Sequence, residues 1–224
     1  MDSTNPLAPQ QGRSRDTAQR LLSATLRLID EAGLDGATIP KIAALAGVAA
    51  ASVYRRYADK DALIRAAFLY ALAQSNQNNQ TQLRGLLLKE TLEDTAQQLM
   101  NLLLAQYRQH PVLFRALSHY LDTTTHREFI EEARAIMQAN AQEVIAVLLH
   151  HRADIAHPDP EQALRFALFS AIGAIETFAL DANALWHAYP EFSGEYVIAA
   201  QAHSFVAYLR SAPKTPASGV VQAR

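Results

Sequence analysis

The sequence predicts an all-α fold of about nine helices, in which a three-helix helix-turn-helix domain precedes a larger helical domain. The composition favours helix, because only eight glycines and nine prolines occur in 224 residues that are rich in Ala, Leu and Gln. Apolar residues recur at intervals of three and four along most of the chain. No segment alternates between apolar and polar residues long enough to predict a strand.

The composition also limits the class of protein. Half of the residues are apolar and 19% are charged, which is typical of a globular protein. The absence of cysteine excludes disulfides and thiolate metal sites. No apolar run reaches the roughly 20 residues that span a bilayer, and the first residues lack the apolar core of a signal peptide. We therefore expect a cytoplasmic protein without a membrane partner.

The first predicted helix runs from about residue 15 to 32. Its apolar stripe is spaced for one helix face and consists of Ala18, Leu22, Thr25, Ile29 and Ala32. Gly33 is expected to end this helix.

Two short helices with a glycine between them follow. Thr38 has the position of an N-cap, and Pro40 falls in the first turn, where its missing N–H is harmless. Gly47 predicts the turn, and a second short helix ends near Tyr57. Asp59 is expected to cap the fourth helix. Two brief helices joined by such a turn form a helix-turn-helix, whose second helix can enter a DNA major groove.

The remaining helices and the domain boundaries follow from breaks in the pattern. The polar stretch 74–82 is either the solvated end of helix four or a loose connection, and we expect the head and body to meet there. Further helices are expected at 86–109, 111–121, 125–152, 160–181 and 194–211. The predicted domains are a disordered tail at 1–13, a DNA-binding domain at 14–62, an effector-binding and dimerisation domain at 63–211, and a second disordered tail at 212–224.

Eight residues in the helix-turn-helix have the chemistry of a DNA reader. Short side chains near the start of the second helix allow close approach to base edges, while longer polar or basic ones reach bases and phosphates. The candidates are Thr38, Ala50, Ala51, Ser52, Tyr54, Arg55, Arg56 and Lys60. Taken singly, the tyrosine could be a core residue and the arginines a solvated face. Val53 and Tyr57 are expected to pack inward against the first helix.

The charge distribution agrees with this interpretation without requiring it. Residues 1–65 carry nine Lys or Arg and seven Asp or Glu, and residues 66–224 carry eleven and fifteen. A basic head on an acidic body suits DNA binding, although chance explains such a small asymmetry equally well.

This segment resembles the helix-turn-helix of the TetR family of transcriptional regulators. The positions that carry the resemblance are Thr38, Ile39, Ile42, Ala43, Ala46, Gly47, Val48, Tyr54, Arg55, Tyr57, Lys60 and Leu63. Two positions depart from the family pattern. Ala49 stands where family members usually have Ser or Thr, and Ala51 where they usually have Gly. Losing the hydroxyl cap is expected to cost on the order of 1 kcal/mol and to change the usual contacts with DNA.

The resemblance implies a homodimer that represses transcription from a palindromic operator until a small-molecule effector binds the body. Activation is also compatible with the sequence. The candidates for an effector pocket are Leu103, Tyr107, Phe114, His119, Tyr120, Phe129, Met137, Phe166, Phe169 and Glu176. An aromatic stripe at helical spacing is more often ordinary core, and Glu176 could instead pair with an arginine across a dimer.

The resemblance also places the dimer interface on the last two long helices. Small residues there allow another helix to approach closely: Ala167, Ser170, Ala171, Ala174, Ala200, Ser204 and Ala207. Packing within one chain explains small residues nearly as well.

Two other classes of protein were considered. An all-helical enzyme is disfavoured because the chain lacks paired Glu-x-x-His motifs, H-E-x-x-H, a glycine-rich phosphate loop and G-x-S-x-G. We therefore predict no catalytic residues, no metal site and no cofactor. A helical protein-interaction scaffold with a non-functional head is the second alternative, and a steep salt dependence of DNA affinity would distinguish a true DNA-binding protein from it.

Overall fold

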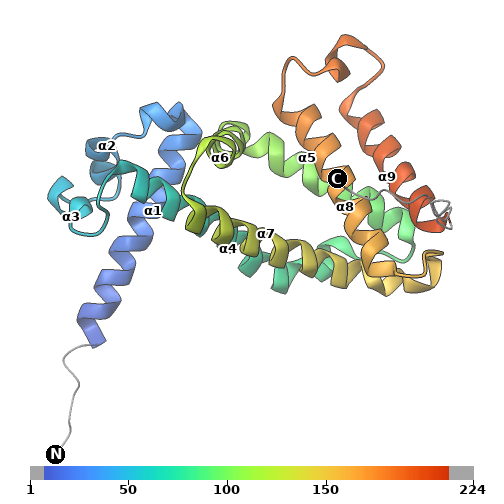
Figure 1. Cartoon of the computed structure of the whole chain (residues 1–224), viewed down its shortest axis with the longest axis horizontal. Helices are drawn as coiled ribbons and strands as arrows, with labels where there is room; N and C mark the ends of the chain where they lie inside the picture. Colours follow the sequence, from blue (N-terminus) through green and yellow to red (C-terminus); the bar gives the residue numbers. More distant parts are fainter. Residues whose placement is uncertain (1–7, 212–224) are drawn as a thin grey trace, which may run out of the picture. The chain divides into compact units, whose positions relative to one another are not determined.

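The computed structural model describes residues 8–211, without the side chains of residues 8–13 and 75–82. This part of the chain is helical and contains no strand, which confirms the predicted all-α class. The elements are α1 (Ala8–Gly36), α2 (Ile39–Leu45), α3 (Ala50–Tyr54), α4 (Lys60–Leu87), α5 (Leu92–Gln109), α6 (Pro111–Thr123), α7 (Arg127–Leu148), a 3-10 helix η1 (Leu149–Asp154), α8 (Pro160–Leu180), a 3-10 helix η2 (Leu185–Ala188) and α9 (Gly194–Arg210) (Figure 1).

The chain forms two compact units whose limits differ from the predicted domains. Unit 1 comprises residues 1–78 and 107–140, and unit 2 comprises residues 79–106 and 141–224. The predicted boundary at residue 62 separated the head from α6 and the first part of α7, which belong to its compact unit. Because a compact unit and a functional domain are different things, the functional division stays a prediction.

The boundaries of the first four helices agree with the sequence in most respects. Gly33 has a left-handed φ of 71° and interrupts α1 where an end was expected. The helix begins at Ala8, which lies inside the predicted tail at 1–13. Residues 1–7 and the predicted tail at 212–224 lie outside the described residues. Asp59 caps α4 as predicted, because its Oδ1 accepts a hydrogen bond from the Ala62 N–H at 2.7 Å.

The break between the fourth and fifth helices lies later than predicted. The backbone of α4 is helical through the polar stretch 74–82, so this stretch is not a loose connection, although the limit between the two units falls inside it. The next helix starts at Leu92 instead of residue 86. Thr91 and Asp94 form its start, since Thr91 Oγ1 accepts from the Asp94 N–H at 3.1 Å and donates to Asp94 Oδ2 at 2.7 Å. This capping pattern has no glycine or proline to mark it.

The core of unit 1 joins the helix-turn-helix to α1, α4, α6 and α7. Its fully buried side chains come from α1, α2, α3 and α4 and include Leu21, Ile29, Ile42, Val53, Leu63 and Phe68. Phe129 and Ala133 of α7 and Ala116 of α6 are buried in the same cluster. The third helix, α3, therefore rests on the same apolar core as the helices that follow it.

Unit 2 is built around the pairing of α8 with α9 (Figure 1). Leu164, Leu168 and Ile175 of α8 and Val197 and Leu209 of α9 are buried. By length and composition alone, α8 could cross a membrane, but a core helix of a globular domain passes the same test. Its packing against α9 accounts for the buried part of this apolar sequence.

A buried histidine belongs to unit 2. The side chain of His151 is 5% exposed, and its Nε2 lies 2.9 Å from Thr95 Oγ1, which also accepts a hydrogen bond from the Lys89 N–H at 3.0 Å. This geometry suits a neutral imidazole that accepts the Thr95 hydroxyl hydrogen. Burial lowers the pKa of His151 below its ordinary value of 6.5, and the neighbouring His150 lowers it further, while Asp154 and Glu93 oppose the change.

The lowered pKa predicts a loss of stability at mildly acidic pH. The unfolded chain binds a proton at residue 151 more readily than the folded chain, so this contribution is full above pH 6.5 and is lost as the pH falls through the lowered pKa. We expect the urea midpoint of wild type to fall between about pH 7.5 and about pH 5.5, and that of His151→Gln to fall less. The exposed His119→Gln variant is the matched control and should follow wild type.

Candidate nucleic-acid interface

The turn between α2 and α3 is held by backbone hydrogen bonds that require a left-handed residue. Gly47 has φ 65°. Its N–H donates to the Ala44 carbonyl at 3.1 Å, and the Val48 N–H donates to the Ala43 carbonyl at 2.9 Å. These two bonds form a Schellman motif, which satisfies carbonyls at the end of α2. Glycine is favoured at this position because other residues are strained at positive φ.

The third helix turns one side into the core and the other toward solvent. Val53 is 0% exposed and Tyr57 packs half-buried against the same core, as predicted, whereas Tyr54 is 58% exposed. Arg55 and Arg56 are exposed as well. Burying Val53 contributes roughly 1.5–3 kcal/mol, which fixes the orientation of a helix of only five residues. The predicted long polar and basic side chains are therefore exposed at the end of α3 and in the turn that follows it.

Two serines hold the two arginines. Arg55, which directly follows α3, donates from its Nη2 to Ser52 Oγ at 2.9 Å. Arg56 Nη2 donates to Ser14 Oγ at 3.1 Å, across 42 residues of sequence. Ser52 is half-buried, while Ala50 and Ala51 are exposed at the start of the helix. Ala49 occupies the N-cap of α3 and gives no side-chain hydrogen bond, as its methyl side chain dictates.

The two flanking candidates have different surroundings. Thr38 is the N-cap residue of α2, as predicted, but its side chain makes no capping hydrogen bond. Lys60 Nζ donates to the Leu34 carbonyl at 2.7 Å near the end of α1. An ammonium group has three donors, so this bond leaves capacity for a phosphate.

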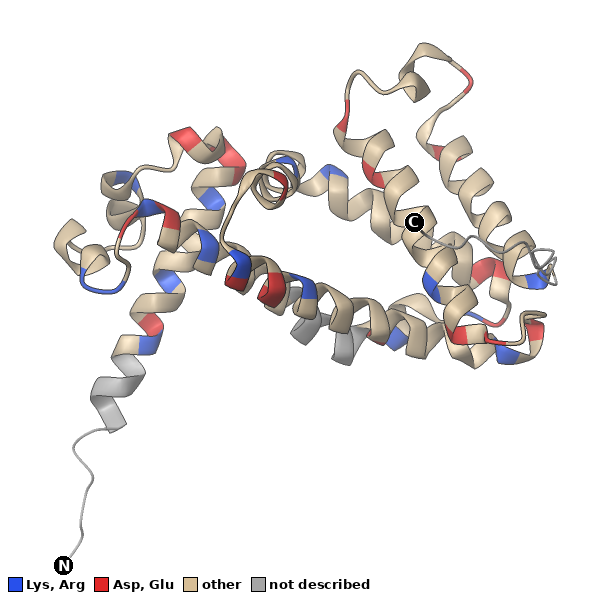
Figure 2. Ribbon diagram, in the orientation of Figure 1, with Lys and Arg blue, Asp and Glu red and all other residues tan. Residues whose placement is uncertain are grey.

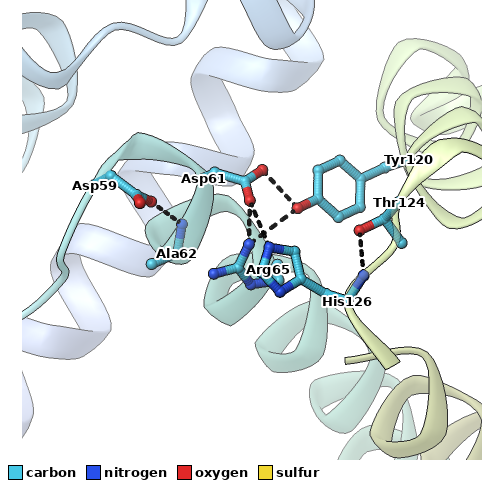
Figure 3. A network of polar contacts seen from close by, with 7 residues as sticks. All are labelled: Asp59, Asp61, Ala62, Arg65, Tyr120, Thr124 and His126. Atoms are coloured by element: carbon cyan, nitrogen blue, oxygen red, sulfur yellow. Dashed lines mark hydrogen bonds and ion pairs between the residues drawn. The ribbon is translucent and has the colours of Figure 1, made fainter. Parts of the chain in front are cut away.

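A polar cluster joins the first turn of α4 to the α6–α7 connection within unit 1 (Figure 3). Asp61 is its centre. Its Oδ1 accepts from the Tyr120 hydroxyl at 2.5 Å, and its Oδ2 forms ion pairs with Arg65 and, at 3.5 Å, with His126 Nε2. Burial and the bond to Asp61 raise the pKa of the Tyr120 hydroxyl, while its contacts with Arg65 and Thr124 oppose the change. Asp61 directly follows Lys60, so the cluster fixes the helix start beside the DNA-reading segment.

Two residues of the expected effector pocket belong to the aromatic core around this cluster. The Tyr120 ring lies 5.6 Å from Phe68 and 5.4 Å from Phe129, measured between ring centroids. Phe129 is 4% exposed. For these two aromatic residues, the structure favours the alternative interpretation as ordinary core.

The other pocket candidates are spread over both compact units. Tyr107 and Phe114 stack edge to face at 4.9 Å, and His119 is exposed, in unit 1. Leu103 and Glu176 are half-buried in unit 2. Three further aromatic or methionine side chains are exposed on helix surfaces: Met137, Phe166 and Phe169.

Both units have surface grooves, but these grooves are lined by residues other than those of the expected effector pocket. A groove of about 540 Å³ lies between α1 and α2, one of about 400 Å³ between α5 and α9, and another of about 400 Å³ along residues 89–98. None of the three is lined by a residue of the expected pocket. The location of an effector pocket therefore stays a prediction.

The predicted interface residues on α8 and α9 divide between the two sides of these helices. Ala167 and Ala171 are 5% and 2% exposed, so they pack inside unit 2 and are not available to a second chain in this structure. Ser170, Ser204 and Ala207 are exposed, and Ala174 and Ala200 are half-buried. The exposed side of α8 also carries Phe166 and Phe169, at 58% and 52% exposure, which the sequence interpretation had placed in a pocket.

The described residues contain no group of three or more His, Asp or Glu side chains arranged to hold a metal ion. Three histidines form hydrogen bonds with a carboxylate, a hydroxyl and a carbonyl group instead: His110 with Asp30, His151 with Thr95, and His187 with the Phe178 carbonyl.

Comparisons with known proteins agree with the geometry. Residues 21–67 match the model of the bacterial regulatory proteins of the tetR family. An uncharacterized HTH-type transcriptional regulator of Mycobacterium tuberculosis is 29% identical over 146 residues, which cover 62% of this chain and 67% of the relative. The HTH-type transcriptional regulator BetI of Burkholderia thailandensis is 38% identical over 64 residues, covering 29% of this chain and 33% of BetI.

Solved structures share the fold. A TetR-family regulator from Mesorhizobium loti has a TM-score of 0.65 at 19% identity, covering 87% of this chain and 97% of its own. The regulator FadR from Bacillus subtilis in complex with stearoyl-CoA has a TM-score of 0.58 at 16% identity, covering 86% of this chain and 97% of its own. At these identities the likeness shows the fold alone.

The polar cluster predicts a measurable contribution of the Tyr120 hydroxyl. Tyr120→Phe keeps the ring between Phe68 and Phe129 but removes the donor to Asp61, so we expect a loss of about 1 kcal/mol in the free energy of unfolding. Chemical denaturation followed by circular dichroism measures it. Tyr70→Phe is the control, because the Tyr70 hydroxyl accepts only an exposed bond from Gln19 at 3.1 Å. Equal effects of the two variants would contradict the assignment.

Proposed function

This chain belongs to the TetR family of transcriptional regulators, and from that membership we propose that it is a dimeric repressor which a small-molecule effector releases from a palindromic operator. The single observation that carries the DNA-binding part is the two-sided recognition helix. Val53 anchors α3 in the core, while Tyr54 at its end and Arg55 and Arg56 directly after it are exposed. We propose that these side chains, with Ala50, Ala51, Ser52, Thr38 and Lys60, contact the operator.

The roles of these residues follow from their chemistry. An arginine guanidinium can bind guanine O6 and N7 or a phosphate in a bidentate manner. Ala51 is exposed at the start of α3 and offers a methyl group to a thymine. Thr38 retains a hydroxyl that is not used for capping, and this hydroxyl can donate to a phosphate.

The exposed apolar side of α8 supports a dimer. Phe166 and Phe169 lie more than half exposed, and the neighbouring Ser170 and Gly173 allow close approach of another helix. The Phe166 ring lies 5.0 Å from Tyr208 of α9, so the apolar surface continues onto that helix. Ala200, Ser204 and Ala207 add small side chains there. A two-fold dimer would place two recognition helices roughly 34–36 Å apart, the spacing of successive major grooves.

The Asp61 cluster supports a route for regulation. Tyr120 and His126 bind the first turn of α4, immediately after the DNA-reading segment. An effector that binds preferentially to a conformation with a displaced α6–α7 connection would move α4 and lower the affinity for DNA. The size of this effect is limited by the difference between the effector's affinities for the two conformations. The FadR structure with stearoyl-CoA supports the use of this fold to hold a small molecule. We infer a cytoplasmic regulatory role without catalysis, as for other members of this family.

The proposal predicts specific and salt-dependent binding to the DNA upstream of the chain's own gene. Arg55→Ala should weaken binding by about 10- to 100-fold, because a guanidinium contact with a base contributes about 1–3 kcal/mol. Tyr54→Phe removes only a hydroxyl and should cost up to about tenfold. Gel-shift or fluorescence-anisotropy titrations at several salt concentrations measure both effects.

The exposed Arg134→Ala variant on α7 is the control and should bind as wild type does. If wild type shows no sequence-specific binding at moderate salt, the regulator would not act through this DNA, and the proposed function would be refuted. Binding that is insensitive to Arg55 and Tyr54 would refute the assigned recognition residues.

The dimer is tested separately by charge placed on the apolar side of α8. Phe169→Glu would bury like charges at a two-fold interface, so we expect wild type to be a dimer at micromolar concentration and Phe169→Glu to be a monomer. Light scattering coupled to size-exclusion chromatography measures the mass. Met137→Glu, at a side chain that is 45% exposed on α7, should remain dimeric. A monomeric wild type would contradict the interface.

A further inference from the structure

We propose that the segment of α1 from Ser14 to Arg20 forms a second edge of the DNA interface, in which Ser14 positions Arg56 and Arg20 binds a backbone phosphate. The inference rests on the proposed DNA-binding function and extends it to residues that precede the family-matched segment 21–67.

Two contacts place this segment beside the recognition helix. At the C-terminal end of α3, Arg56 Nη2 donates to Ser14 Oγ at 3.1 Å. At the other end, Arg20 Nη1 lies 3.5 Å from the point where a Cβ atom at Gly47 would stand, in the turn that leads into α3. The segments that directly precede and follow α3 therefore each lie close to the same stretch of α1.

The lengths of the two helical segments agree with this arrangement. From Ser14 to Arg20 an α-helix rises about 9 Å, and the five residues of α3 rise about 7.5 Å. Val53 and Leu21 are both fully buried in the core between them. We infer from these contacts that a duplex which receives α3 also comes close to the Ser14–Arg20 stretch of α1.

The charges on this edge favour a phosphate at the Gly47 end. Figure 2 shows basic residues along α1 and on the connection after α3. Arg20 is exposed, and its Nη2 donates to Thr17 Oγ1 at 3.5 Å, while its Nη1 lies near the turn at Gly47. Asp16 lines the same groove one turn earlier and repels an anion there. Arg27, two turns later, is committed to an ion pair with Glu31 at 2.7 Å.

Ser14 acts through Arg56 and need not touch DNA itself. An arginine side chain loses considerable rotational freedom when it binds, and a hydrogen bond that already restricts it reduces this loss. Ser14 and Arg56 are both exposed, so removing either side-chain group leaves the core of unit 1 intact. This makes the pair suitable for a double-mutant cycle.

The test is a set of titrations of the upstream duplex with wild type, Ser14→Ala, Arg56→Gln and the double variant. We expect Ser14→Ala to weaken binding by about three- to tenfold in the wild-type background, and to have no further effect when Arg56 is already Gln. Circular dichroism melting confirms that each variant remains folded. Equal effects of Ser14→Ala in the two backgrounds would overturn the positioning role.

The phosphate contact is tested through the salt dependence of the same binding. Arg20→Gln should lower the slope of log affinity against log salt by about one, whereas the ion-paired Arg27→Gln should leave it unchanged. An unchanged slope for Arg20→Gln, or an equal decrease for Arg27→Gln, would overturn the role of Arg20. Absence of any binding by wild type would refute the proposed function together with this inference; normal binding by wild type with unaffected variants would refute the inference alone.

Discussion

The burial of Val53 is the interaction on which the DNA-binding surface depends. A helix of five residues is too short to be stable by itself, and Ala49 gives α3 no capping side chain. Its conformation is therefore imposed from outside, by Val53 in the core and by the hydrogen-bonded turn at Gly47. With Val53 turned inward, Tyr54 is left 58% exposed, whereas Ser52 stays half-buried.

The features that the sequence predicted correctly are mostly local. The turn at Gly47, the cap at Asp59 and the inward face of Val53 each follow from the chemistry of a few consecutive residues. The start of α5 was misplaced because the capping pair Thr91 and Asp94 marks a helix start without glycine or proline. Such a capping pair is visible in the sequence, but it marks a helix start only where the preceding helix ends. That end, at Leu87, could not be located from the residues around it.

Contacts between distant parts of the chain could not be read from the sequence. The bond between Ser14 and Arg56 spans 42 residues, and that between Tyr120 and Asp61 spans 59. The small-residue pattern on α8 shows the same limit, since it identifies a side suited to close packing but not the partner. In the structure Ala167 and Ala171 face the interior of unit 2, while Phe166 and Phe169 are left exposed.

The hydrogen bonds that orient Arg55 and Arg56 also limit the net free energy that these arginines can contribute to DNA binding. When Arg55 binds a base, its hydrogen bond to Ser52 must be kept in a compatible geometry or exchanged for one to DNA. An exchange of one hydrogen bond for another contributes little net free energy, whereas counterion release from phosphates adds to it. With Ala49 and Ala51 supplying no polar group, we expect base-specific hydrogen bonds to come from Ser52, Tyr54, Arg55 and Arg56. In the proposed complex, phosphate contacts would then supply most of the affinity, and a few side chains whose positions depend on the core beneath α3 would supply the specificity.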